Sequence, residues 1–296
     1  MNRRTYTQMI AEKRKGPLFM VLASIMWSFG GLLIKLIPWG AMSIIGLRAI
    51  FAAGVFVVYR RSIKINFTRG NILAALCLSA TTVLFVFANK LTTAAAAILL
   101  QFSAPVFILI IELVFYKKKP TISAGVAVLV TILGMLLFFA DRLGTGSTLG
   151  NILAIASGLT FAGVFVSNKR KDTDPDQSLL LGFLINAVIG LPFVFTQVNT
   201  DAVAWIAVVF LGIVQVGLAY MFFSIGIKKT PALLACLITA IEPVLNPVLV
   251  MIFMKEIPGR FAIAGGAIIF LTVVGYNIWV EKHPVIADDK LLTENE

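Results

Sequence analysis

The sequence contains ten runs of about 20 mainly apolar residues, separated by short segments with charged residues, glycine or proline. At a rise of 1.5 Å per residue, an α-helix of this length crosses the roughly 30 Å hydrocarbon core of a bilayer. Because lipid cannot satisfy backbone N–H and C=O groups, runs of this kind span a membrane as helices. The chain is therefore predicted to be an all-α integral membrane protein with ten transmembrane helices, at residues 17–37, 39–59, 71–89, 91–116, 121–140, 149–168, 178–197, 202–227, 231–254 and 258–280.

The composition excludes an ordinary soluble enzyme. Charged residues make up only 13% of the 296 residues, whereas soluble domains have about 25%. The connections between the apolar runs are short, so no extramembrane domain is expected. Outside the helices we expect only a basic cytoplasmic segment at residues 1–16, which should remain attached because it lacks a cleavage site, and a solvated cytoplasmic tail at residues 281–296.

The net charge of +11 follows from where the basic residues lie. Nineteen of the 25 Lys and Arg residues fall in the first 16 residues, in every second loop and in the tail. Membrane proteins concentrate Lys and Arg on the cytoplasmic side. Both termini are therefore predicted to be cytoplasmic, in a multi-pass protein of the inner membrane, and the charge is explained without a nucleic-acid partner.

The two halves of the chain resemble each other. Shifts of 133 to 141 residues superpose several segments in the same order: Gly30 on Gly163, residues 104–106 on 242–244, and residues 131–134 on 272–275. This pattern predicts two five-helix repeats, at residues 17–140 and 149–280. Because five is odd, the second repeat must be inserted upside down, which is the architecture of secondary carriers with a midplane substrate site.

Motifs for other chemistries are missing from the sequence. It has no Walker A pattern and no H-E-x-x-H, and its two cysteines, Cys77 and Cys236, lie far apart within apolar runs. We therefore expect no enzymatic activity, no metal site and no cofactor, and interpret the cysteines as packing residues.

Three motifs resemble the ten-helix EamA-type transporters of the drug/metabolite transporter superfamily. Ala23, Trp27 and Lys35 follow the spacing of that family's first-helix pattern, although Ser28 stands where the family usually has glycine. Arg48, followed by small residues, is similar to the family's second helix. Residues 242–244, Glu-Pro-Val, match its second-repeat motif closely.

The resemblance covers residues 17 to 281. It implies the ten-helix fold and a carrier that exports a small metabolite by alternating access, with an amino acid or related compound as the leading substrate class. It does not specify the substrate, since family members export amino acids, sugars, nucleotide derivatives, cations or drugs.

Glu242 is the most conspicuous polar residue in the predicted membrane region. A charged side chain at the centre of a transmembrane helix costs about 2.5 to 3.5 kcal/mol on insertion scales and needs a partner, water or a function. Thr239, Glu242 and Asn246 share a helix face, and Pro243 and Pro247 remove backbone donors around them. We expect Glu242 to bind a substrate ammonium or a proton. The alternative is a structural ion pair with a basic residue of the other repeat, Arg48 being the leading candidate.

Further side chains are candidates for the lining of a central cavity. Some of them have a structural alternative: Lys35 could extend to the membrane interface, and Trp27 could simply pack. Glu112 is expected to pair with nearby lysines. Pro105, Pro243 and Pro247 are candidate hinges. The remaining candidate lining residues are Trp27, Ser28, Lys35, Arg48, Asn89, Gln101, Gln215, Tyr220, Thr239 and Asn246.

Two other functions remain open from the sequence. One is a proton-coupled exporter of organic cations or drugs that uses Glu242. The other, from a different class, is a channel or a non-transporting membrane scaffold, for which the sequence offers neither a filter-like loop nor a docking module. The expected partners are a small-molecule substrate and the lipid bilayer, with protons in the coupled alternative. The sequence leaves the choice between a monomer and a homodimer open.

Overall fold

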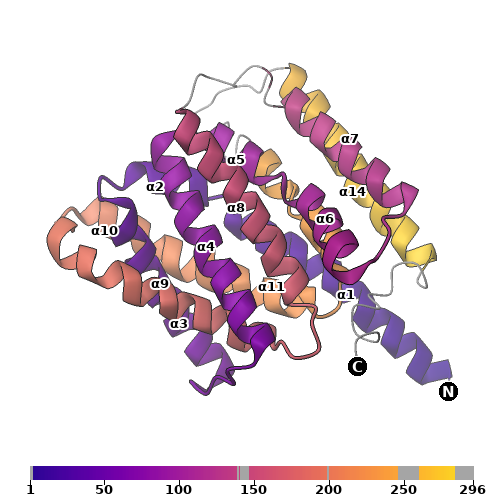
Figure 1. Cartoon of the computed structure of the whole chain (residues 1–296), viewed down its shortest axis with the longest axis horizontal. Coiled ribbons are helices and arrows are strands. Elements are labelled where there is room, and N and C mark those ends of the chain that lie inside the picture. Colours follow the sequence, from indigo (N-terminus) through magenta and orange to yellow (C-terminus); the bar gives the residue numbers. More distant parts are fainter. Residues whose placement is uncertain (1–2, 139, 141–146, 199, 246–259, 284–296) are drawn as a thin grey trace.

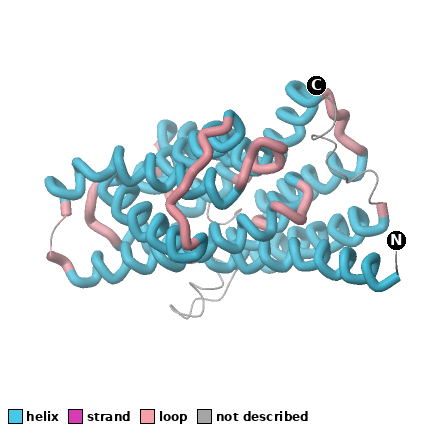
Figure 2. Tube along the Cα trace, turned by 90° about the horizontal axis from the view of Figure 1, so that it is seen from below, coloured by secondary structure: helices cyan, strands magenta, loops and turns pink. Residues whose placement is uncertain are grey.

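The computed structural model describes residues 3–138, 140, 147–198, 200–245 and 260–283. Figures 1 and 2 show that the described residues form helices joined by short loops, with no strand in these ranges. In chain order the helices are α1 (Arg3–Trp27), α2 (Gly30–Leu36), α3 (Ala41–Arg60), α4 (Arg69–Leu91), α5 (Ala94–Gln101), α6 (Ala104–Tyr116), α7 (Ile122–Phe138), α8 (Thr148–Ser167), α9 (Pro175–Gln197), α10 (Ala202–Phe210), the π-helix η1 (Leu211–Leu218), α11 (Ala219–Ile227), α12 (Ala232–Ile238) and α14 (Arg260–Lys282).

The described helices have the length and composition of membrane spans. Seven helical stretches are long and apolar enough to cross a bilayer. The helix α7 is shorter but also apolar, and its outward face carries large aliphatic side chains such as Leu129 and Leu133, which are more than half exposed. These features fit the predicted all-α integral membrane protein.

Several helices expected to be continuous are interrupted. The segment predicted at residues 17–37 forms two helices, because α1 ends at Trp27 and α2 begins at Gly30. The segment predicted at 91–116 is broken between Gln101 and Ala104, and α12 ends at Ile238 before a further helical turn at residues 241–245. In the segment 202–227, a π-helical stretch separates α10 from α11.

Two of these breaks have the same cause. A proline lacks an N–H, and its ring clashes with the carbonyl four residues earlier, which is Gln101 for Pro105 and Thr239 for Pro243. Pro105 lies in the first turn of α6, a position where no intrahelical N–H bond is lost. The chain is therefore interrupted a few residues before each proline. The role of Pro105 and Pro243 as hinges stays a prediction. Pro247 lies outside the described residues.

Helix α1 begins earlier than predicted. It starts at Arg3 and includes Pro17, so the basic segment continues the first apolar helix. The residues between Gln8 and Lys15 include strong helix formers such as Ala, Glu, Lys and Arg, and the first proline comes only at residue 17. The helix can therefore extend through this polar stretch.

Close packing between helices depends on a few glycines. A Cβ atom placed on Gly46 of α3 would lie 2.7 Å from the carbonyl carbon of Gly190 of α9, so the two backbones touch at this crossing. Helix α7 packs along α14 in the same way: a Cβ atom on Gly265 would lie 2.5 Å from the carbonyl oxygen of Gly134. Figure 1 shows the α7 and α14 pair beside the other helices.

Candidate functional site

An aromatic cluster surrounds Trp27 at the end of α1. The Trp27 ring centroid lies 4.9 Å from that of Tyr220 on α11 and 5.9 Å from those of Phe161 on α8 and Phe223 on α11. Phe183 of α9 contacts Tyr220 from another side, at 5.6 Å. Trp27 is 4% exposed, and its indole Nε1 has no hydrogen-bond partner among the described residues.

The break in α1 faces the π-helix η1. Gln215 of η1 is buried, and its Nε2 donates a hydrogen bond of 3.4 Å to the carbonyl oxygen of Trp27. A Cβ atom on Gly30, at the start of α2, would lie 2.6 Å from the same Nε2 atom. The glycine thus leaves room for the Gln215 amide at the point where helix α1 loses its regular hydrogen bonds. The Oε1 atom of Gln215 is buried without a partner in the described structure.

Arg48 of α3 is a buried cation next to Tyr220. Its side chain is largely covered, the residue being 6% exposed, and its Nε has no hydrogen-bond partner within the described ranges. Gly212 of η1 packs on its backbone, since a Cβ atom there would lie 2.9 Å from the Arg48 carbonyl oxygen. The guanidinium is close enough to Tyr220 for the two side chains to interact electrostatically.

Glu242 lies in the helical turn that follows the break after α12. It is half-buried, and its carboxyl also interacts electrostatically with Tyr220. The ion pair with Arg48 that the structural alternative expected is wrong: no such contact within 4 Å joins these two described residues.

The breaks after α1 and α12 lie near each other. The Ser24 hydroxyl donates 2.8 Å to the Met20 carbonyl of its own helix and lies 3.5 Å from the carbonyl oxygen of Ile238, the last residue of α12. This contact joins the first half of the chain to the second. The structure therefore brings Trp27, Gln215, Arg48, Tyr220 and Glu242 into one region, which we call the central site.

The remaining predicted residues are placed differently. The hydroxyls of Ser28 and Thr239 donate to carbonyls of their own chain segments, Ile25 at 2.6 Å and Cys236 at 2.6 Å. Gln101 ends α5, and its carbonyl packs against Gly158 of α8. Asn89 is fully buried near the end of α4, and neither amide atom has a partner in the part of the chain described. The Lys35 side chain and Asn246 lie outside what the structure describes.

Glu112 pairs with a lysine, as predicted. Its carboxylate lies 3.5 Å from Lys118 Nζ, and its backbone carbonyl accepts from the Lys118 N–H at 3.0 Å. Glu112 is therefore a structural carboxylate at the end of α6.

Polar contacts join the loops at the end of the bundle where Glu112 lies. Asp172, between α8 and α9, accepts from Arg170 and from the backbone N–H of Gly70, which is in the first turn of α4. The hydrogen bond from Arg170 is the main reason that the pKa of Asp172 lies below its ordinary value. Lys228, after α11, pairs with Asp176 at 2.6 Å.

Sequence reasoning missed Phe161, Phe183 and Phe223. These residues are apolar and lie on helices with many other apolar residues, so nothing in the local sequence indicates which ones face Trp27. The repeat alignment pairs Phe161 with Ser28 of the first repeat. This pairing identifies the equivalent position, but it does not indicate which neighbour the Phe161 side chain contacts.

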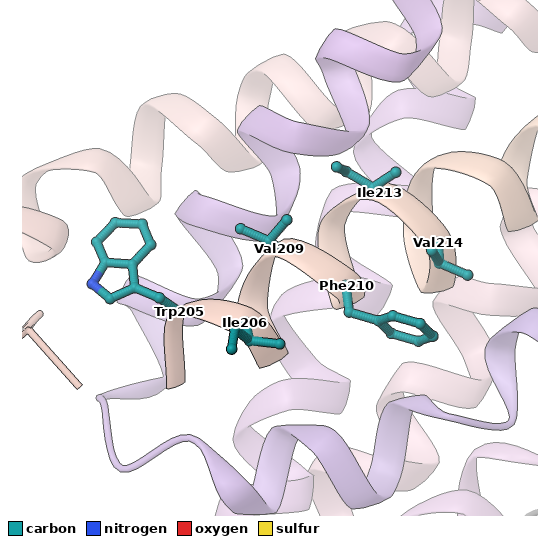
Figure 3. Close-up of a pocket in the computed structure, with 6 residues that line it drawn as sticks. All are labelled: Trp205, Ile206, Val209, Phe210, Ile213 and Val214. Atoms are coloured by element: carbon teal, nitrogen blue, oxygen red, sulfur yellow. The ribbon is translucent and has the colours of Figure 1, made fainter. Parts of the chain in front are cut away.

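A shallow groove on the outside of the bundle has a different character. Figure 3 shows that it is lined only by side chains of α10 and η1: Trp205, Ile206, Val209, Phe210, Ile213 and Val214. The lining offers no charged group to recognise a polar solute, so this groove suits lipid chains. A metal site is also unsupported: no group of three or more His, Cys, Asp or Glu side chains gathers within the described ranges.

Comparisons with known proteins agree with the fold. A model of the EamA-like transporter family matches residues 14–140 and again 148–278. The uncharacterized transporter YwfM of Bacillus subtilis (strain 168) is 24% identical over 272 residues, which cover 86% of this chain and 90% of the relative. An uncharacterized transporter of Archaeoglobus fulgidus is 26% identical over 194 residues, or 64% of this chain and 69% of that protein.

A solved crystal structure shows the same fold. It superposes with a TM-score of 0.74 at 17% sequence identity and covers 91% of this chain and 99% of its own. The apolar helices and the transporter relatives together define a multi-pass membrane transporter, which works in contact with lipid and a small-molecule substrate. The chain belongs to the EamA-like transporter family.

Proposed function

We propose that the protein is a secondary carrier of the inner membrane that exports a small metabolite, an amino acid or a related compound, by alternating access. In this proposal ten transmembrane helices form two inverted five-helix repeats, at residues 17–140 and 149–280, with both termini in the cytoplasm. The two separate family matches, each close to 130 residues long, support the division.

The observation that carries the proposal is the pair of equivalent helix breaks. The shift of 138 residues that aligns Pro105 with Pro243 also aligns the break after Gln101 with the break after Ile238 and Thr239. Discontinuous helices at matching positions of two repeats are typical of carrier substrate sites, where free backbone groups meet ligand or water. Rocking of the two halves about the central site would then expose it to each side in turn.

Contacts at the two ends of the bundle support the orientation. Loops rich in Lys and Arg meet each other at one end, as in the Lys228–Asp176 pair and in the hydrogen bond from Lys169 to the Ile227 carbonyl. At the other end Trp39 packs on Trp205, with ring centroids 5.4 Å apart. The positive-inside rule assigns the basic end to the cytoplasm.

The test is flux of radiolabelled amino acids into proteoliposomes that contain the purified protein. The proposal expects saturable uptake and counterflow of at least one of the twenty, above the level of liposomes without protein. Absence of flux for all twenty would remove the amino-acid proposal, and flux that does not saturate would favour the channel alternative.

A second candidate is a proton-coupled exporter of organic cations or drugs. It is favoured by Glu242, a half-buried carboxyl that forms no ion pair with the buried Arg48 among the described residues. Under this proposal Glu242→Gln abolishes proton-driven exchange of a cation while the protein still folds. Unchanged coupling in that variant would end the idea.

A further inference from the structure

The helix breaks at residues 102–103 and 239–240 each follow a segment that is fixed in the main bundle, by which we mean α1–α5 and α8–α12 with η1. Before the first break, the carbonyl oxygen of Gln101 would lie 2.6 Å from a Cβ atom on Gly158 of α8. Before the second, all seven residues of α12 are buried. The chain therefore enters both breaks from well-packed positions.

The segments that follow the two breaks contact each other through α7 and α14. A Cβ atom on Gly265 of α14 would lie 2.5 Å from the carbonyl oxygen of Gly134 of α7. A Cβ atom on Gly266 would lie 3.3 Å from Cγ1 of Val244. Val244 belongs to the helical turn at residues 241–245, directly after the second break. Close packing therefore joins the segment after one break to the segment after the other.

The same segments are less covered by the rest of the protein. Only 22% of the residues in the apolar stretch of α14 are buried, against 56% in those of α3 and α4. Along α6, Ala104 and Ile108 are buried, whereas Val114 and Phe115 are 62% and 73% exposed. A segment with few buried contacts is held less firmly. Helix α6 is thus anchored at the end next to its break, and its far end is held more weakly.

Within the main bundle, hydrogen bonds tie the two halves of the chain together. The Ser79 hydroxyl of α4 donates to Asn186 of α9 at 2.6 Å, and the Thr81 hydroxyl of α4 donates to Thr160 of α8 at 2.9 Å. The close glycine crossing of α3 and α9 joins the halves as well. Separation of the first half from the second would break all of these contacts.

We propose that α6, α7, the turn at residues 241–245 and α14 form one body, the α7–α14 body, which moves against the main bundle with the two breaks as its hinges. The proposal rests on the proposed function and specifies its motion: both halves of the chain contribute helices to each body, and the rocking takes place between the two bodies. Hinges of this kind are a few residues at the ends of helices. Glu242 lies in the moving turn, whereas Trp27 and Tyr220 belong to the main bundle. The motion therefore changes the position of Glu242 within the central site.

Two engineered disulfides test the rigidity of each body, in a protein whose two native cysteines are replaced by alanine. Thr81→Cys with Thr160→Cys joins α4 to α8, where the two hydroxyl oxygens lie 2.9 Å apart. Gly134→Cys with Ile269→Cys joins α7 to α14, since a Cβ atom on Gly134 would lie 3.0 Å from Ile269 Cγ1. Each disulfide lies within one body, so both should leave the flux of labelled amino acid unchanged.

A third disulfide fixes the first hinge. Ser103→Cys with Gly158→Cys joins the break to α8, since a Cβ atom on Gly158 would lie 2.5 Å from Ser103 Oγ. It should lower the rate of flux about tenfold or more, and dithiothreitol should restore the rate. Unchanged flux here would overturn the proposal. So would loss of flux with the disulfide between α4 and α8, which would show that the halves separate there, or with the one between α7 and α14.

Proline substitutions test the hinges without a cross-link. Pro105→Ala and Pro243→Ala remove the ring that clashes with the carbonyl four residues earlier, so the helix can continue through the break. Both should lower the maximal rate of flux. Pro192→Ala is the matched control, because Pro192 lies inside the continuous helix α9 and should have no such effect. Equal rates in all three variants would contradict the hinges.

A measurement without substrate distinguishes this proposal from the proposed function. Spin labels on Leu271 of α14 and Leu76 of α4, both more than half exposed, report the distance between the two bodies. Labels on Leu271 and Leu133 of α7 report a distance within the α7–α14 body. In nanodiscs the first pair should give the broader distribution of distances, and equal widths would overturn the proposal whether or not amino acids are transported. A broader first distribution without flux of any amino acid would contradict only the proposed function.

Discussion

The Nε2 atom of Gln215 lies 3.4 Å from the carbonyl oxygen of Trp27. Gln215 belongs to a π-helix in the second half of the chain, whereas Trp27 is the last residue of α1 in the first half. π-Helical turns are rare and occur often at functional sites. Here the wider turn coincides with the residue whose amide supports the broken end of a facing helix.

Removal of the Gln215 amide should weaken the contact between η1 and the end of α1. We expect Gln215→Ala to destabilise the protein by about 1 to 2 kcal/mol, because a buried carbonyl loses its donor and a cavity replaces the side chain. Thermal unfolding in detergent measures the change. Thr272→Ala is the control, since the Thr272 hydroxyl only bonds back to Ile268 within α14. Equal shifts for the two variants would show that the contact with Trp27 is unimportant.

The crossing of α3 and α9 should not tolerate a side chain. In Gly190→Ala, the new methyl group would press on the backbone of Gly46 and force the helices apart, at a cost of about 1 to 3 kcal/mol. Gly125→Ala of α7 is the matched control, because no atom lies within 4 Å of its Cβ position and alanine favours helix by about 1 kcal/mol. The midpoint of thermal unfolding should therefore fall in Gly190→Ala and rise in Gly125→Ala. A change in the same direction in both variants would contradict the close contact between α3 and α9.

A buried hydrogen bond joins α4 to α9. Ser79 Oγ donates 2.6 Å to Asn186 Oδ1. A double-mutant cycle with Ser79→Ala and Asn186→Ala should give a coupling energy of about 0.6 kcal/mol, the average for such bonds in membrane proteins. The unfolding free energies of the four proteins supply this value. Strict additivity of the two substitutions would mean that the bond contributes nothing.

The loop contact of Asp172 should make stability depend on pH. Its pKa is lowered from 3.8, so the folded state favours the carboxylate. The stabilisation is present above the ordinary pKa and is lost as the pH falls through the lower pKa of the folded state. Asp172→Asn should therefore be less stable than wild type at pH 7, and the difference should disappear well below pH 3.8.

The expected size of this effect is small. The Asp172 side chain is 37% exposed, so solvent screens its ion pair with Arg170, and we expect less than about 1 kcal/mol. The stability difference between Arg170→Gln and wild type should depend on pH in the same way, because this variant removes the main cause of the lowered Asp172 pKa. A stability difference that persists unchanged in acid would contradict this account, as would a difference that does not decrease in high salt.

The sequence by itself determines the all-helical membrane fold and the transporter class. Long apolar runs leave the backbone no alternative to helices in lipid, and motifs such as Glu242-Pro243-Val244 carry the family resemblance. It also predicts the Glu112–Lys118 pair, because both residues lie near one helix end. These features depend on length, composition and spacing along the chain.

Only the tertiary structure decides which polar groups meet. Local spacing cannot show that Gln215 reaches Trp27, that Phe161 and Phe223 face the same ring, or that Arg48 stays apart from Glu242. In lipid, apolar helix faces differ little in their preference for one neighbour over another, so close glycine contacts and a few hydrogen bonds set the arrangement. Those contacts join residues more than 100 positions apart, and their geometry exists only after the helices have packed.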